Sequence, residues 1–148
     1  MPYKQPISVL VVIYTLSLEV LLLERADFPG YWQSVTGSRE DAESLRETAI
    51  REAFEETGLD VEKHVLHDWQ LQNVYDIYPK WQHRYPPDTT INTEHVFGLE
   101  LSGAFPVRLS PREHLSYIWL PWQEASEKVF SPSNRAAILQ LPERVQHV

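Results

Sequence analysis

Four glutamates fall within ten residues of the stretch RETAIREAFEETGLD, which spans residues 46–60. In a helix, which turns by about 100° per residue, Glu52, Glu55 and Glu56 project from one stripe. Like charges at this spacing repel one another and weaken a helix by a few tenths of a kcal/mol, and a bound cation would reverse that effect. Charge spacing alone therefore leaves two interpretations, a solvated face or a cation site.

The composition limits the available chemistry. The chain has 148 residues, so we expect one domain over residues 1–148. It has no cysteine, which excludes disulfides, thiolate metal sites and a cysteine nucleophile. This composition is compatible with a reducing cytoplasm, where we expect the protein. Its net charge of −8 argues against nucleic acid polymers as partners, because binding them requires a basic surface.

Apolar runs near the N-terminus predict two buried strands. Residues 7–14 form a run rich in β-branched residues, and a second run ends at Glu24 and Arg25 after an interrupting Glu19. These runs are too short and too interrupted for a signal peptide or a membrane span. We therefore expect no membrane partner.

The rest of the chain alternates strand and helix patterns. Ser44 and Glu47 fit a capping box that starts a helix ending near Thr57, with Gly58 as its stop. The aromatic and proline-rich residues 78–94 are typical of a binding loop. The other expected elements are strands at residues 31–37, 69–75, 95–101 and 117–120, and a final helix at residues 134–141 with Ser131 or Ser133 near its N-cap. This order predicts an α/β layered domain.

A wider pattern surrounds the acidic stretch. From Gly37 the chain reads glycine, five residues, Glu43, seven residues, and then REAFEETGL at residues 51–59. This pattern resembles the box of the Nudix hydrolase family, written GX5EX7REUXEEXGU with U a bulky aliphatic residue. Every fixed residue type matches at its spacing, and Ala53 in the first U position is the one departure. The resemblance implies an α/β (α+β) Nudix fold, in which a mixed β-sheet lies between helices.

The resemblance also implies roles for the charged residues of the box. Glu52 and Glu56 would be metal ligands, and Glu55 would be a third ligand or act through a bound water. Arg51 would orient these catalytic groups by pairing with a glutamate. The expected cofactor is Mg²⁺, with Mn²⁺ as a substitute, because cleavage of a phosphoanhydride requires neutralisation of phosphate charge. The group that deprotonates the water varies within the family.

Three other box residues would have structural roles by the same resemblance. Glu43 would steady the loop before the helix, and Gly37 and Gly58 would permit tight backbone turns. Ala53 is smaller than the usual residue at its position, so it places local packing, rather than metal binding, in question.

A second resemblance concerns the substrate. YWQSVTGS before the box, HRYPPDTTINTEHVFGLEL, EHLSYIWLP and SPSNRAAI together resemble the bacterial Nudix enzymes that act on dihydroneopterin triphosphate in folate synthesis. Those enzymes release pyrophosphate and leave dihydroneopterin monophosphate. The likeness implies that Glu113 is a further catalytic carboxylate that completes the metal site. The alternative is an ordinary exposed loop glutamate.

This likeness also implies a substrate pocket. Arg25 ends a strand, where its guanidinium could bind a phosphate with two donors. Tyr75 could stack on the pterin while Asp76 reads the edge of the ring, or Tyr75 could belong to the core. Trp81 and Tyr85 could be lid residues or loop anchors. The expected substrate-binding residues are Lys4, Arg25, Thr36, Tyr75, Asp76, Ile77, Tyr78 and Ser131.

Two other functions stay open beside this one. One is a broader nucleoside triphosphate pyrophosphohydrolase, acting for example on dATP, and the other is a catalytically silent Nudix-fold protein that binds a ligand. Gly98 and Gly103 have the interval of a phosphate loop but lack its following Lys and Ser or Thr, and the sequence contains no GxSxG or HExxH motif. The expected partner is therefore a small-molecule triphosphate.

Overall fold

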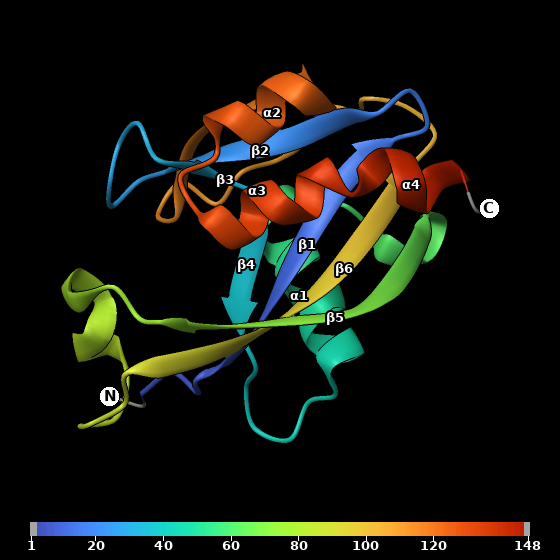
Figure 1. Cartoon of the computed structure of the whole chain (residues 1–148). Coiled ribbons are helices and arrows are strands. Elements are labelled where there is room, and N and C mark those ends of the chain that lie inside the picture. The colour runs from blue at the N-terminus through green and yellow to red at the C-terminus, as the bar shows by residue number, and fades with distance from the viewer. Residues whose placement is uncertain (1–2, 147–148) are drawn as a thin grey trace.

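The computed structural model describes residues 3–146 (Figure 1). In chain order its elements are β1 (Ile7–Thr15), β2 (Glu19–Arg25), β3 (Trp32–Gln33), β4 (Val35–Ser38), α1 (Leu45–Thr57), the 3-10 helix η1 (Val61–Lys63), β5 (Val65–Asp76), the 3-10 helix η2 (Pro79–Arg84), β6 (Ile91–Leu101), β7 (His114–Pro121), α2 (Trp122–Lys128), α3 (Pro132–Leu139) and α4 (Leu141–Gln146).

The first strand, β1, runs through the centre of the sheet. It pairs in parallel with β6 from Ile7 to Thr15. Its other edge pairs antiparallel with β4 near one end and with β2 near the other. Residues 9–14 are all buried, because both faces of β1 are covered. This explains why the run is continuously apolar instead of alternating.

The sheet branches on either side of β1. On one side β6 pairs antiparallel with β5. On the other, β2 pairs with β1 at Tyr14 and Val20, and it pairs antiparallel with β7 along its length and with β3 near its end. The result is a mixed seven-stranded sheet.

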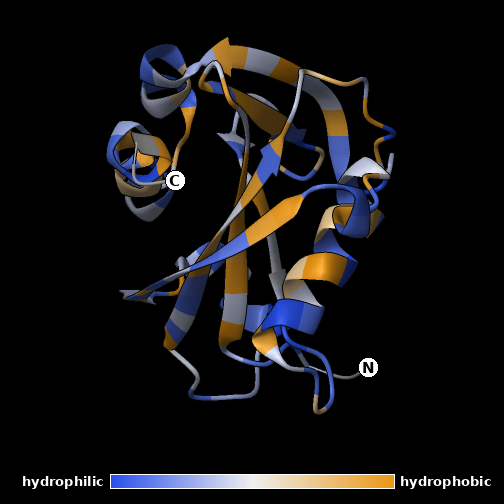
Figure 2. Ribbon diagram, turned by 90° about the vertical axis from the view of Figure 1, so that its right-hand side faces the viewer, coloured by the Kyte–Doolittle hydropathy of each residue, from blue (hydrophilic) through white to orange (hydrophobic). Residues whose placement is uncertain are grey.

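Helices cover both faces of the sheet, with α1 at the right of Figure 2 and the C-terminal helices at the left. Val11 and Phe97 belong to the apolar core on the α1 face, whereas their neighbours Val12 and Val96 belong to the core under α2, α3 and α4. Successive side chains of a strand point to opposite faces, so β1 and β6 supply both cores. The predicted architecture, a mixed sheet between helices, is confirmed.

Helix α1 begins and ends where the sequence predicts. The backbone N–H of Glu47 donates to Ser44 Oγ, and the N–H of Ser44 donates to the Glu47 carboxylate, which completes the capping box. Gly58 adopts a left-handed φ of 73°, and its N–H donates to the carbonyl of Phe54. Ala53 is fully buried in the core under α1, so the smaller residue is accommodated there.

Two expected elements are each divided in the structure. Residues 31–37 form two short strands, because Ser34 between them donates its N–H to Asn134 Oδ1. The expected final helix is two helices, α3 and α4, that meet at Gln140. Ser131 is the N-cap of α3, and its hydroxyl accepts from the N–H of Asn134.

Three of the predicted strands are longer in the structure, and three short helices were not predicted. The strands expected at residues 69–75, 95–101 and 117–120 are parts of β5, β6 and β7. The helices α2, η1 and η2 span seven residues or fewer, too few to show a helical period in the sequence. Among residues 3–146, every helix falls short of the length and apolar character that crossing a bilayer requires.

Candidate active site

The acidic stripe of α1 is mostly buried. Glu52 is 8% exposed and Glu56 is 2% exposed. Their side chains turn toward Gly37 and His114, respectively. The side chain of Glu55 keeps 47% of its surface exposed. The solvated-face interpretation is therefore wrong for two of the three glutamates.

Gly37 of β4 lies directly against the Glu52 side chain. A Cβ atom at residue 37 would overlap Glu52 Cγ, Cδ and Oε2. Glycine is needed here for the close approach of a strand to a helix side chain. The prediction of a tight turn at Gly37 is wrong, because the residue lies within strand β4.

Arg51 connects the loop before α1 to the glutamates of the helix. Its Nε donates to Glu43 Oε2 at 2.7 Å, and its Nη1 donates to Glu52 Oε1 at 2.6 Å and to Glu55 Oε1 at 3.3 Å. The guanidinium lowers the pKa of Glu43 to about 2. Glu43 Oε1 also accepts from the N–H of Glu40, which fastens the loop. The ion pairs implied for Arg51 are thus present.

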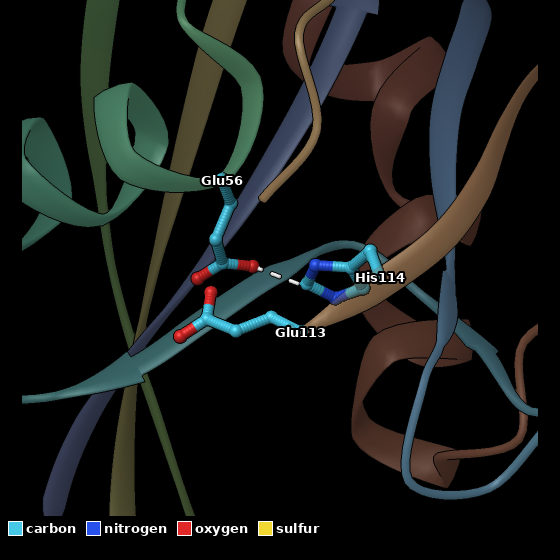
Figure 3. A group of neighbouring side chains, drawn as sticks. All are labelled: Glu56, Glu113 and His114. Carbon is cyan, nitrogen blue, oxygen red and sulfur yellow. Dashed lines mark ion pairs between the residues drawn. The ribbon is translucent and has the colours of Figure 1, made fainter. Parts of the chain in front are cut away.

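Three side chains, one from α1 and two from the point where β7 begins, converge beside this network (Figure 3). Glu56, Glu113 and His114 each offer one ligand atom, and these atoms lie within 4.8 Å of one another. His114 Nε2 lies 3.7 Å from Glu56 Oε1. Glu113 immediately precedes β7, so the start of this strand carries both residues to the end of α1.

The electrostatics of the three residues favour a bound cation. Burial, followed by the charges of Glu52 and Glu113, raises the pKa of Glu56 well above its ordinary value. Glu56 Oε1 is buried and has no hydrogen-bond partner among the described residues. Burial also lowers the pKa of His114 to about 4, so its ring is neutral and can coordinate a metal. An orphaned carboxylate oxygen among like charges fits a divalent cation with oxygen ligands.

Two adjoining cavities open at this site. The acidic cleft, of about 630 Å³, is lined by Arg51, Glu52, Glu55, Glu56 and Glu113 among others. The aromatic pocket, of about 260 Å³, is lined by Tyr75, Tyr78, Trp81 and Phe130 among others. Lys4, Arg25, Thr36 and Arg84 line both cavities, and we call this shared region the junction. The junction supplies the local positive charge that an acidic protein needs to bind phosphates.

Arg25 is engaged within the junction. Its Nε and Nη2 donate to the two Asp27 oxygens, both at 2.7 Å, and its Nη1 donates to Gln33 Oε1 at 2.9 Å. Its guanidinium stacks over the ring of Trp81, 4.4 Å from the centroid. Arg84 Nη2 donates to the same Asp27 carboxylate at 3.0 Å. A phosphate bound to the donors of Arg25 would therefore compete with Asp27.

Aromatic rings form the wall of the pocket. Tyr78 and Trp81 meet edge to face with centroids 5.3 Å apart, and Trp81 lies 5.9 Å from Phe130. η2, within the yellow-green segment beyond β5 in Figure 1, carries Trp81 into this wall. The Tyr75 hydroxyl accepts from Asn92 Nδ2 at 3.1 Å. Because Tyr75 lines the pocket, it is not simply a core residue.

The structure brings together the residues that sequence reasoning singled out. All of the expected substrate-binding residues line the aromatic pocket, and all of the expected catalytic and metal-binding residues line the acidic cleft. Asp76 is exposed, whereas Ile77 is buried. The roles of these residues stay predictions.

Sequence reasoning missed several residues that line the cavities, among them His114, Arg84 and Glu94. His114 lies beside the predicted Glu113, but a lone histidine at the start of a strand gives no signal. Arg84 lies in η2, whose approach to the junction depends on the tertiary fold. Glu94 lines the aromatic pocket and shares its strand face with Val96, so a charged residue on an inward face was the available signal.

Residues 4–141 match the NUDIX domain family, a span that contains the acidic helix and, except for Tyr3, the residues that line the two cavities. The chain belongs to the Nudix family. The Nudix fold predicted from the box is thereby confirmed.

Two curated relatives cover almost the whole Nudix domain. The chain is 43% identical over 141 residues to dihydroneopterin triphosphate diphosphatase of Escherichia coli strain K12, covering 93% of each chain. It is 41% identical to the protein of the same name from Haemophilus influenzae, covering 93% of this chain and 88% of that one. A solved structure of the E. coli dihydroneopterin triphosphate pyrophosphohydrolase superposes with a TM-score of 0.90 and covers 95% of this chain and 97% of that one.

Family and relatives together identify the protein as a Nudix pyrophosphohydrolase. The carboxylate and histidine group fits the divalent metal that Nudix hydrolases use. Relatives and structural neighbours act on small molecules that carry phosphate groups, such as dihydroneopterin triphosphate and Ap4A.

Proposed function

We propose that this Nudix enzyme hydrolyses dihydroneopterin triphosphate, with Mg²⁺, to dihydroneopterin monophosphate and pyrophosphate. The observation that carries this function is the arrangement of an acidic cleft and an aromatic pocket around a cationic junction. A flat heterocycle suits the pocket, a triphosphate suits the junction, and a metal-assisted hydrolysis suits the cleft. The two diphosphatase relatives, which cover most of the chain, support the same substrate.

In this proposal Glu52, Glu56 and Glu113 hold the metal. When bound, Mg²⁺ would neutralise phosphate charge and activate a water molecule. Arg51 keeps Glu52 in position through its 2.6 Å ion pair, and His114 Nε2 lies 3.7 Å from Glu56 Oε1 (Figure 3). Glu55 is the most exposed carboxylate of the stripe, which suits a role through a bound water. Water attacks, and the bond between the α- and β-phosphates breaks.

The remaining residues bind the substrate in this proposal. Lys4, Arg25 and Thr36 at the junction contact the triphosphate, and residues 75–78 line the pterin pocket with Ser131 beside them. Burial and the nearby Arg84 charge lower the pKa of Lys4, and the negative charge of an incoming phosphate would raise that pKa again. Residues 1–148 would form one domain, and the enzyme would work in the cytoplasm, where folate synthesis would take place.

Pyrophosphate release from a panel of substrates tests this function. The panel contains dihydroneopterin triphosphate, dATP, ATP and ADP-ribose, each assayed with Mg²⁺ and with EDTA. We expect a metal-dependent preference for the pterin of at least about tenfold in kcat/KM. A flat profile across the triphosphates would instead favour the broader nucleoside triphosphate pyrophosphohydrolase. Absence of turnover on every substrate would favour the ligand-binding protein, which the retained carboxylate cluster argues against.

A further inference from the structure

The floor of the aromatic pocket contains a buried carboxylate that the proposed mechanism does not use. Glu94 of β6 is 3% exposed and lines the pocket. It pairs in register with Ser8 of β1 and Asn73 of β5. Successive side chains of β6 alternate between faces, so Glu94 shares its face with Asn92 and Val96. Val96, at one end of this face, packs in the apolar core. Asn92, at the other end, lines the floor of the pocket together with Glu94.

Among the described residues, every partner of the Glu94 carboxylate is neutral. Asn73 Nδ2 donates to Glu94 Oε1 at a long 3.4 Å, and the hydroxyls of Ser133 and Tyr75 also interact with the carboxylate. Burial raises the pKa of Glu94, and these hydrogen bonds oppose that shift. A buried carboxylate without a cationic partner is costly to fold. Such a group is expected where a ligand supplies the missing donors.

A second acceptor lies beside it without a partner. Asn92 is 1% exposed, and its Nδ2 donates to Ser8 Oγ at 2.7 Å and to the Tyr75 hydroxyl at 3.1 Å. Its Oδ1 is buried and has no hydrogen-bond partner among the described residues. The pocket floor therefore offers the Glu94 oxygens and Asn92 Oδ1 as acceptors beneath aromatic walls. Such a floor fits a flat ring with adjacent N–H donors on one edge.

We propose that Glu94, with Asn92, reads the ring N–H and 2-amino edge of the substrate's heterocycle and so selects a pterin over adenine. This inference rests on the proposed function and deepens it. A 2-amino-4-oxopyrimidine ring has two adjacent donors that a carboxylate can accept side by side. Adenine places an acceptor nitrogen beside its amino group, so one Glu94 oxygen would face a lone pair. By resemblance, Asp76 was expected to hydrogen-bond to the edge of the ring. We assign this interaction to Glu94 instead, because Asp76 is exposed and Glu94 is buried at the floor of the pocket.

The isosteric variant Glu94→Gln tests the assignment. We expect kcat/KM for dihydroneopterin triphosphate to fall by about 100-fold, while kcat/KM for dATP changes by less than about threefold. Neopterin has the ring and no phosphate, so its binding in EDTA, followed by pterin fluorescence, reports on the pocket independently of the metal. We expect its Kd to rise by about 30-fold or more. The control is Glu62→Gln, an exposed glutamate of η1, which should leave all three quantities unchanged.

The outcomes separate this inference from the proposed function. If the wild type prefers the pterin and Glu94→Gln keeps that preference, Glu94 does not read the ring and the function stands. An equal loss on both triphosphates would show a merely structural role and would also overturn the inference. If the wild type shows no pterin preference, the function and the inference both fail. Should Glu94→Gln not fold, the pterin-to-dATP ratio of Glu94→Asp decides, and an unchanged ratio overturns the assignment.

Discussion

Gly37 has no room for a side chain because the carboxylate of Glu52 occupies the position that a Cβ atom would take. We predict that Gly37→Ala forces the Glu52 side chain into another rotamer, away from the acidic cleft, while the fold is kept. The expected loss in Mg²⁺-dependent kcat/KM is at least about tenfold, or about 1.4 kcal/mol of transition-state stabilisation. Steady-state kinetics over a range of Mg²⁺ concentrations measures it.

The control for this substitution is Gly103→Ala. A Cβ atom at residue 103 would meet nothing within 4 Å, so activity and Tm should stay at wild-type values. Unchanged kcat/KM in Gly37→Ala would show that the exact position of Glu52 does not matter for catalysis.

Glu56→Gln should separate stability from catalysis. Glu56 is buried near the charges of Glu52 and Glu113, so removing its charge relieves repulsion in the metal-free protein. We expect Tm in EDTA to equal or exceed that of the wild type, whereas kcat falls by about 100-fold or more, because removing one ligand charge costs about 3 kcal/mol in the transition state. Scanning calorimetry and kinetics measure the two effects.

Added Mg²⁺ provides a further readout on Glu56. It should raise the Tm of the wild type and have a smaller effect on Glu56→Gln, because a ligand that binds the folded state stabilises it by an amount that grows with the logarithm of its affinity. Equal Mg²⁺-induced shifts in both proteins would remove Glu56 from the metal site.

The ion pair between Glu43 and Arg51 predicts a pH-dependent stability. The folded-state pKa of Glu43 is about 2, below its ordinary value of 4.5, so the pair stabilises the fold fully above pH 4.5. Its contribution is lost as the pH falls toward about 2. We expect Glu43→Gln to lower Tm in EDTA by about 3 °C at pH 7, corresponding to about 1 kcal/mol. That gap should narrow steadily below pH 4.5, as measured by thermal unfolding from pH 7 to pH 3. A gap that widened on acidification would refute the assignment.

Trp81 should affect substrate binding more than the chemical step. Its ring contacts Tyr78 and Phe130 in the pocket wall and supports the Arg25 guanidinium. We expect Trp81→Leu to raise KM for dihydroneopterin triphosphate by about tenfold, because a stacking face and a cation–π contact together contribute about 1.4 kcal/mol. The value of kcat should stay within about threefold. Phe105→Leu, at an exposed aromatic residue outside both cavities, is the matched control.

Local signals account for the elements that were predicted well. The capping box at Ser44 and Glu47 and the left-handed Gly58 set the ends of α1, because both interactions form within a few residues. The apolar run that became β1 predicted a buried strand, and the structure shows that both of its faces are covered. Short segments were predicted poorly, as in the division of residues 31–37 at Ser34, where the decisive hydrogen bond comes from Asn134, 100 residues away.

The spacing of the acidic box, the helix that presents it and the α/β class were predictable from the sequence alone, because these features depend on local periodicity and capping. The burial of Glu52 and Glu56 and the exposure of Glu55 depend on the tertiary structure, since β4 packs against α1 and the start of β7 brings His114 to Glu56. Tertiary structure also placed His114 against Glu56 and Glu94 on the pocket floor. Neither position follows from residue type, because each depends on strand pairings between residues far apart in the chain.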